Sequence, residues 1–226
     1  WRPSWRPSVV RRFQPGFTFE HFLDPNTGAT QEGYVSIRPF TVQFQNGGQV
    51  QYVAQPNWQR PQSAFRPVPG VEIGPGRYDY LRHSFIMQSD PSARLSARLE
   101  GAFGGYFDGR LTTWRAVAQA TPDPRVAVSI DYMANRLSEV GLTRASLTTH
   151  LLGVEARLAA SPRFQLVSFA QWNTVARQLT LNARLAFEYQ PLSFFTIVYN
   201  DRSAVEGRGV LTAAPVPSRQ LLAKIT

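Results

Sequence analysis

Three pairs of oppositely charged residues, two or four positions apart, have the types and spacing that could do chemistry together. They are Arg98 with Glu100, Glu155 with Arg157, and Arg184 with Glu188. Hydrolysis by a carboxylate pair needs two such groups about 5 to 9.5 Å apart across a cleft, and the sequence places no two carboxylates in that way. We therefore expect no catalytic residue. Two interpretations stay open for the charged pairs: a structural ladder, or a wall that selects or binds a solute.

Metal and cofactor chemistry have little support in the sequence. The three histidines, His21, His83 and His150, lie far apart without ligand spacing, and cysteine is absent, which excludes disulfides, cysteine-ligated zinc and thiol nucleophiles. There is no phosphate-binding loop, no dinucleotide-binding glycine motif and no nucleophile elbow. We expect neither a metal nor a cofactor.

The net charge of +9 comes from 24 basic and 15 acidic residues, and Lys224 is the only lysine. A nucleic-acid-binding domain concentrates its basic residues in a patch or stripe. Here the arginines are spread along the whole chain. The charge therefore predicts no nucleic-acid partner.

The elements that must position these residues are β-strands, because apolar and polar side chains alternate with period two. The clearest run is 179–189, where Leu, Leu, Ala, Leu, Phe and Tyr alternate with Thr, Asn, Arg, Ala and Glu. Similar runs begin at Leu95, Val126 and Leu152, whereas the facing of 163–174 stays ambiguous. Each of the clear runs predicts one apolar face and one polar face.

This alternation predicts two sets of side chains and a third set at strand ends. We expect lumen-lining polar residues at Arg98, Glu100, Asp131, Glu155, Arg157, Asn182, Arg184 and Glu188. We expect lipid-facing residues at Leu95, Leu99, Phe103, Val128, Ile130, Leu152, Val154, Leu158, Leu181, Leu185 and Phe187. Aromatic residues near strand ends predict membrane-interface girdles, or else ordinary sheet packing, at Tyr78, Tyr80, Trp114, Tyr132, Trp172, Tyr189 and Tyr199.

Turn signals divide the chain into about twelve strands of roughly 8 to 15 residues, long enough for tilted membrane strands of about 9 to 11 residues. Short breaks at 45–48, 89–93, 121–125, 160–163 and 189–193 alternate with others that include long stretches at 60–76, 135–145 and 201–217. Outer-membrane barrels sort their connections in this way. With no apolar run of about 18 residues, the sequence predicts an all-β, antiparallel, up-and-down transmembrane β-barrel. Residues 1–226 form one region of it.

Several stretches together carry a family resemblance. They are 69–79 (PGVEIGPGRYD), 104–110 (GGYFDGR), 169–173 (FAQWN), 198–200 (VYN) and 221–226 (LLAKIT). In this order and spacing they resemble the C-terminal barrel region of large bacterial proteins that carry an N-terminal domain like the family-nine carbohydrate-binding modules. The resemblance covers about Trp58 to the end. It implies an outer-membrane location, further strands upstream, and sugar binding that belongs to the upstream domain.

The function expected from these observations is a passive pore or envelope scaffold in the bacterial outer membrane. Its partners would be membrane lipid, lipopolysaccharide and other envelope proteins. Two alternatives remain open: a soluble β-barrel or sandwich that binds a ligand or glycan, and an enzyme acting on polysaccharide. The first would refold without detergent. The second would lose turnover when one carboxylate is replaced.

Overall fold

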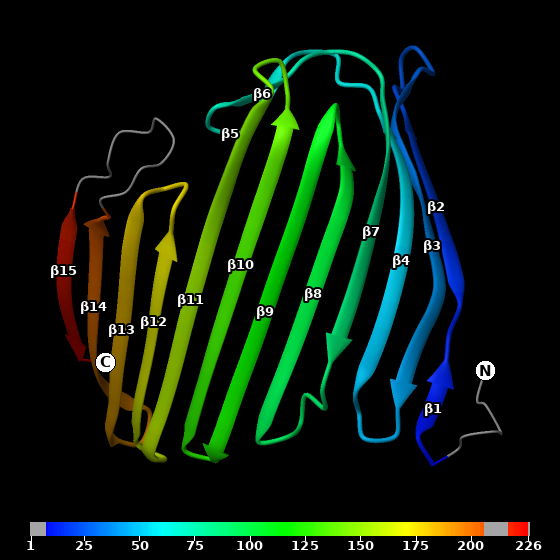
Figure 1. The fold of residues 1–226 in the computed structure, drawn as a ribbon. Coiled ribbons are helices and arrows are strands. Elements are labelled where there is room, and N and C mark those ends of the chain that lie inside the picture. The colour runs from blue at the N-terminus through cyan, green and yellow to red at the C-terminus, as the bar shows by residue number, and fades with distance from the viewer. Residues whose placement is uncertain (1–7, 206–216, 226) are drawn as a thin grey trace. The chain divides into compact units, whose positions relative to one another are not determined.

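The computed structural model describes residues 8–205 and 217–225, and these residues form strands joined by turns, with no helix among them. The strands are traced in Figure 1. Their bounds are β1 Val10–Phe13, β2 Gly16–Leu23, β3 Thr30–Phe44, β4 Gln49–Gln59, β5 Phe65–Val68, β6 Val71–Ile73, β7 Tyr78–Gln88, β8 Leu95–Tyr106, β9 Gly109–Asp123, β10 Val126–Val140, β11 Ala145–Ser161, β12 Phe164–Asn173, β13 Gln178–Gln190, β14 Ser193–Ala204 and β15 Ser218–Ile225.

Thirteen of these strands form one sheet in the order β1-β3-β4-β7-β8-β9-β10-β11-β12-β13-β14-β15, with β2 also paired to β3. Strands β1 and β2 pair with the two halves of β3, so they share one position and the sheet is twelve positions wide. The expectation of an all-β, antiparallel, up-and-down arrangement is confirmed. Among the described residues no pairing joins β1 or β2 to β15, so the structure shows no closed barrel.

Because neighbouring strands run antiparallel, their connections alternate between two ends, which we call the turn end and the loop end. The turn end holds 45–48, 89–94, 124–125, 162–163 and 191–192, all short as expected. The loop end holds 24–29, 60–77, 107–108, 141–144 and 174–177, together with the connection that follows Ala204. The hairpin β5–β6 lies inside the connection 60–77.

Turn residues explain where several strands stop. The Asp24 carboxylate accepts hydrogen bonds from the Asn26 and Thr27 backbone N–H groups, and the Asp90 carboxylate accepts from the Ser92 hydroxyl and backbone N–H. These bonds favour the charged form. The pKa of Asp24 is lowered mainly by the hydrogen bond from the Thr27 backbone N–H. The pKa of Asp90 is lowered mainly by the hydrogen bond from the Ser92 hydroxyl. At a turn, such side-chain hydrogen bonds take the place of the backbone hydrogen bonds that pair neighbouring strands.

The prediction of a long irregular stretch at 135–145 was wrong. Strand β10 continues to Val140 and β11 begins at Ala145, so only 141–144 is a connection. The polar residues Asn135 and Arg136 suggested a loop. They are instead successive residues of a strand and lie on opposite faces of it, and the following Leu137 and Val140 are buried. The stretch predicted at 201–217 begins late as well, since β14 runs to Ala204, and 206–216 falls outside the described residues.

The chain separates into two compact units. Unit 1 comprises 8–92, 98–115 and 134–148, and unit 2 comprises 93–97, 116–133 and the described part of 149–226. All buried residues of the described chain lie in unit 1, and most of them surround the hairpin β5–β6. Every described residue of unit 2 remains at least partly exposed.

Candidate functional site: an apolar and a polar sheet face

The strand register of unit 2 gathers apolar side chains on one face, which we call the apolar face. One row crosses five strands, because Leu158 pairs with Leu166, which pairs in turn with Leu185. The row continues through Ile197 to Ala223. The neighbouring rows on this face, read from β11 to β15, contain Ala156, Ser168, Ala183, Tyr199, Leu221 and Val154, Ala170, Leu181, Asp201, Arg219. Cross-strand apolar pairs stabilise a sheet by about 0.2 to 1 kcal/mol each.

Aromatic rings mark both ends of this apolar face. At the turn end Phe164 pairs with Phe187, and Phe187 pairs with Phe195. Toward the loop end His150 stacks between Tyr132 and Trp172, with ring centroids 6.1 and 6.2 Å apart. A hydrogen bond of 2.8 Å joins the Tyr132 hydroxyl to His150 Nδ1. Strand β12, with 10 residues, therefore has Phe164 near one end and Trp172 near the other.

The opposite side of unit 2, its polar face, holds most of the charged and amide side chains. Glu155 accepts from Arg157 Nε over 2.5 Å, and the Asn182 amide donates to the Asn200 side-chain oxygen. Register places Arg184 and Glu188 on this face too, together with apolar side chains at Val167, Phe169, Phe194, Val198 and Leu222. The facing of β12, which the sequence left ambiguous, is thus resolved, with Leu166 and Trp172 on the apolar face.

Unit 1 repeats the division into two faces. Its apolar face includes an aromatic ladder in which Phe40, Tyr52, His83 and Phe103 stack in succession across β3, β4, β7 and β8. A hydrogen bond of 2.7 Å joins the Tyr52 hydroxyl to His83 Nδ1. The rest of this face carries exposed apolar side chains, among them Phe17, Phe19, Ile37, Leu81, Met87 and Leu99.

The polar face of unit 1 is rich in amides and paired charges. Arg98 donates to Glu100 over 2.5 Å and to the Gln88 side chain over 2.7 Å. Arg82 donates to the backbone oxygens of Gly105 and Leu111. Strand β4 shows the contrast clearly: Gln49, Gln51, Gln55, Asn57 and Gln59 lie on the polar face, where Val53 is a buried apolar exception, and Val50, Tyr52, Ala54, Pro56 and Trp58 lie on the apolar face. Glutamine-rich strands of this kind suit a wetted surface.

The hairpin β5–β6 folds onto the polar face of unit 1 at the loop end. Val71 and Ile73 are fully buried against Leu137 and Val140, with Tyr78, Tyr106, Leu111 and Leu147 packed around them. Tyr78, Tyr106, Leu111 and Leu147 alternate with residues of the apolar face, so they belong to the polar side. Burying four such aliphatic side chains contributes about 1.5 to 3 kcal/mol each. The hairpin is therefore docked on that face.

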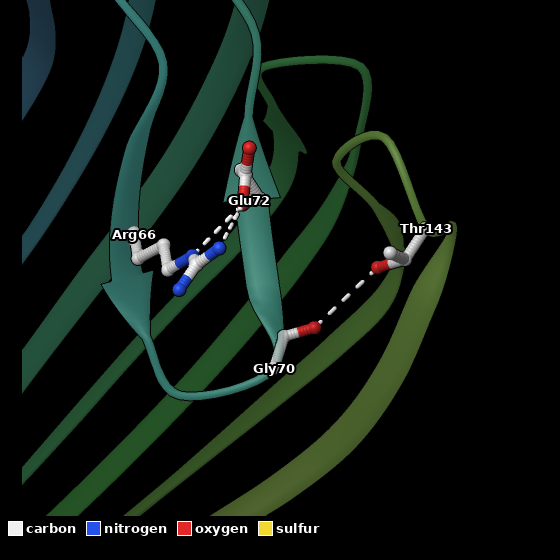
Figure 2. A network of polar contacts seen from close by, with 4 residues as sticks. All are labelled: Arg66, Gly70, Glu72 and Thr143. Atoms are coloured by element: carbon white, nitrogen blue, oxygen red, sulfur yellow. Dashed lines mark hydrogen bonds and ion pairs between the residues drawn. The ribbon is translucent and has the colours of Figure 1, made fainter.

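Polar contacts hold the hairpin in this position, and Figure 2 shows two of them. Arg66 Nη2 lies 2.6 Å from a Glu72 carboxylate oxygen across the hairpin, and the Thr143 hydroxyl donates to the Gly70 carbonyl over 3.4 Å. The Leu142 backbone N–H donates to the Glu72 carbonyl over 2.8 Å. The connection 141–144 therefore clamps the hairpin from the β10–β11 side.

A pocket of about 530 Å³ opens beside the hairpin on the polar face. Its lining combines amides, two tyrosines, two phenylalanines, a proline, one acidic residue and one basic residue. They are Gln31, Glu32, Gln59, Arg60, Pro61, Gln62, Phe65, Tyr80, Tyr106 and Phe107. The Tyr80 hydroxyl donates to Gln59 over 3.1 Å. The lining suits hydrated polar molecules, and sequence reasoning missed it because residues 60–76 show no periodicity.

The structure divides the predicted site residues by face. Each predicted lipid-facing residue lies on an apolar face, and each predicted lumen residue lies on a polar face. Of the predicted girdle residues, Trp114, Tyr132, Trp172, Tyr189 and Tyr199 lie on the apolar faces. Tyr78 and Tyr80 instead lie on the polar face, where Tyr78 packs against the hairpin core and donates to the Gly74 carbonyl.

The described residues hold no group of three or more metal-ligating side chains, and they contain no helix long and apolar enough to cross a membrane. No protein-family model, curated protein or solved structure matches the chain.

Proposed function

We propose that this chain is part of an outer-membrane β-barrel in which the apolar faces contact lipid and the polar faces line a hydrated lumen. The protein would act as a passive pore or envelope scaffold, without a catalytic group, and membrane lipid, including lipopolysaccharide, would surround it. The hairpin β5–β6, docked on the polar face, would narrow the lumen near the loop end.

One observation supports this proposal above the others. In unit 2 an apolar face crosses five strands, and neither it nor the polar face is covered by a second layer within the described residues. A soluble sandwich buries its apolar face against another sheet. A membrane barrel leaves an apolar band about 25 Å tall, flanked by aromatic girdles. The rows from Phe164, Phe187 and Phe195 to Trp172 and His150 have this form.

Adjacent residues on β13 provide the test, since Arg184 and Leu185 lie on opposite faces. The full chain is refolded from urea into phosphatidylcholine vesicles, and folding is followed by heat-modifiable migration on gels. We expect Leu185→Arg to block insertion, because an arginine on the lipid face costs about 2 to 4 kcal/mol at mid-bilayer. Arg184→Leu should insert nearly as well as the parent chain.

Equal effects of the two substitutions would contradict the proposed facing. Folding of the parent chain in buffer without detergent or vesicles would contradict the membrane proposal and favour a soluble ligand-binding barrel or sandwich. Neither outcome depends on knowing the solute that passes through the lumen.

A further inference from the structure

Charged residues on the apolar faces are confined to the loop end. Within the described strands they are Asp79, Arg110, Arg136, Asp201 and Arg219. Asp79 pairs with Arg77 at 2.8 Å, and Asp201 pairs with Arg219 at 3.3 Å. The turn-end halves of the same strands carry aliphatic and aromatic side chains on this face instead, such as Met87, Val128, Phe195 and Ile225.

Arg110 and Arg136 are the exceptions to this pairing, and both belong to unit 1. Both are exposed, and neither takes part in a side-chain hydrogen bond or ion pair within the described chain. Arg110 lies on the same face of β9 as Trp114, whose ring centroid is 5.4 Å from that of Phe85 on the apolar face. Arg136 alternates with Tyr132 in β10. Each arginine therefore lies on the same face as the aromatic residue of its strand, two alternating positions nearer the loop end.

The two arginines are neighbours across β9 and β10. The Thr113 hydroxyl donates to the Asn135 side-chain oxygen over 2.8 Å, which aligns these residues on the polar face. With Thr113 aligned to Asn135 and Gly109 close to the Ser138 and Glu139 carbonyls, we infer that Arg110 and Arg136 are diagonal neighbours on these two adjacent strands. Diagonal neighbours in a sheet are about 7 to 8 Å apart, within reach of two long side chains converging on one anion. Arg144, whose partner Glu139 is 3.7 Å away, follows in the next connection.

Two positive charges that lie side by side on an apolar surface, without an acidic partner, need a counter-ion. That counter-ion must suit both the guanidinium groups and the apolar surface around them. A phosphate accepts paired N–H groups from guanidinium in a planar, bidentate geometry. When that phosphate is joined to acyl chains, the chains can lie against the apolar residues below. Arginine also lets its aliphatic stem follow apolar surface while its head reaches the headgroup level.

We propose that Arg110 and Arg136 form a binding site for the phosphate of a lipid headgroup in the leaflet at the loop end. This inference rests on the proposed membrane function, because it assigns the apolar face of unit 1 to lipid. It adds a chemical preference: the leaflet that surrounds the loop end is one rich in phosphorylated lipid.

The experiment compares two double variants with the same change in charge. Arg110→Gln/Arg136→Gln removes the proposed site, and Arg125→Gln/Arg163→Gln removes two exposed arginines from turn-end connections. Each full chain is folded in maltoside micelles, and binding of dioleoyl phosphatidic acid is titrated by native mass spectrometry. Because the four arginine side chains are exposed, we expect both variants to fold, which heat-modifiable migration checks.

The site variant should bind phosphatidic acid about thirtyfold more weakly than the parent chain, given the attraction of each arginine to an anionic lipid surface. The control variant should change by less than about threefold. Equal losses in both variants, or no loss in the site variant, would overturn the inference. So would inorganic phosphate competing at the same concentration as the lipid, since the site would then recognise a free anion. A parent chain that already folds in buffer without detergent or vesicles would instead refute the membrane function itself.

Discussion

Gly141 shows how strongly one backbone position controls the docked hairpin. Its φ of +78° lies in the left-handed region, and a Cβ there would collide with the backbone carbonyl of Glu72. The neighbouring Leu142 N–H depends on the same carbonyl for its hydrogen bond. By contrast, a Cβ at Gly153 would meet nothing closer than the Phe169 ring at 3.5 Å. The two glycines therefore form a matched pair.

We predict that Gly141→Ala releases the hairpin from the polar face, whereas Gly153→Ala leaves it docked. The strain at a left-handed position and the clash with Glu72 together cost about 1 to 3 kcal/mol. Limited proteolysis of the detergent-folded chain, read by mass spectrometry, should show faster cleavage within 60–77 for Gly141→Ala only. The prediction fails if the two variants are cleaved at the same rate.

At the scale of the element, the hairpin β5–β6 differs from every other strand pair in the described chain. It is paired only with itself, and it supplies two of the buried residues of unit 1, Val71 and Ile73. The Arg66–Glu72 ion pair is a minor contributor to its stability, because the Arg66 side chain is 73% exposed and such pairs contribute about 0 to 1 kcal/mol. Its position depends on apolar burial and on the clamp at 141–144.

Replacing residues 62–76 with a short Gly-Ser linker should widen the lumen if the chain forms a pore. We expect single-channel conductance in planar bilayers to rise, because the hairpin and its apolar contacts no longer occupy the polar face. Arg66→Ala serves as the control and should leave conductance close to that of the parent chain. An unchanged conductance after the replacement would place the hairpin outside the conducting path.

At the scale of the whole molecule, the sequence allowed the strands and their two faces to be predicted, but not the hairpin. Period-two alternation identifies a face within one strand, as in 179–189, and short turns identify one end of the sheet. The hairpin could not be predicted because its docking joins Val71 and Ile73 to Leu137 and Val140, which are far apart in the chain. Register resolved β12 for a similar reason, since Leu166 and Val167 become distinguishable only through their partners Leu185 and Arg184.

The described tryptophans, Trp58, Trp114 and Trp172, all lie on the apolar faces, where Trp58 contacts Phe19 and His21. In a Trp1→Phe/Trp5→Phe variant, tryptophan emission comes from these three rings alone and is an intrinsic optical reporter of the medium that touches this surface. In vesicles containing brominated acyl chains, insertion with the apolar faces toward lipid should quench this emission strongly. Aqueous iodide should then quench it weakly. The reverse order of quenching would mean that water, not hydrocarbon, surrounds the three indole rings.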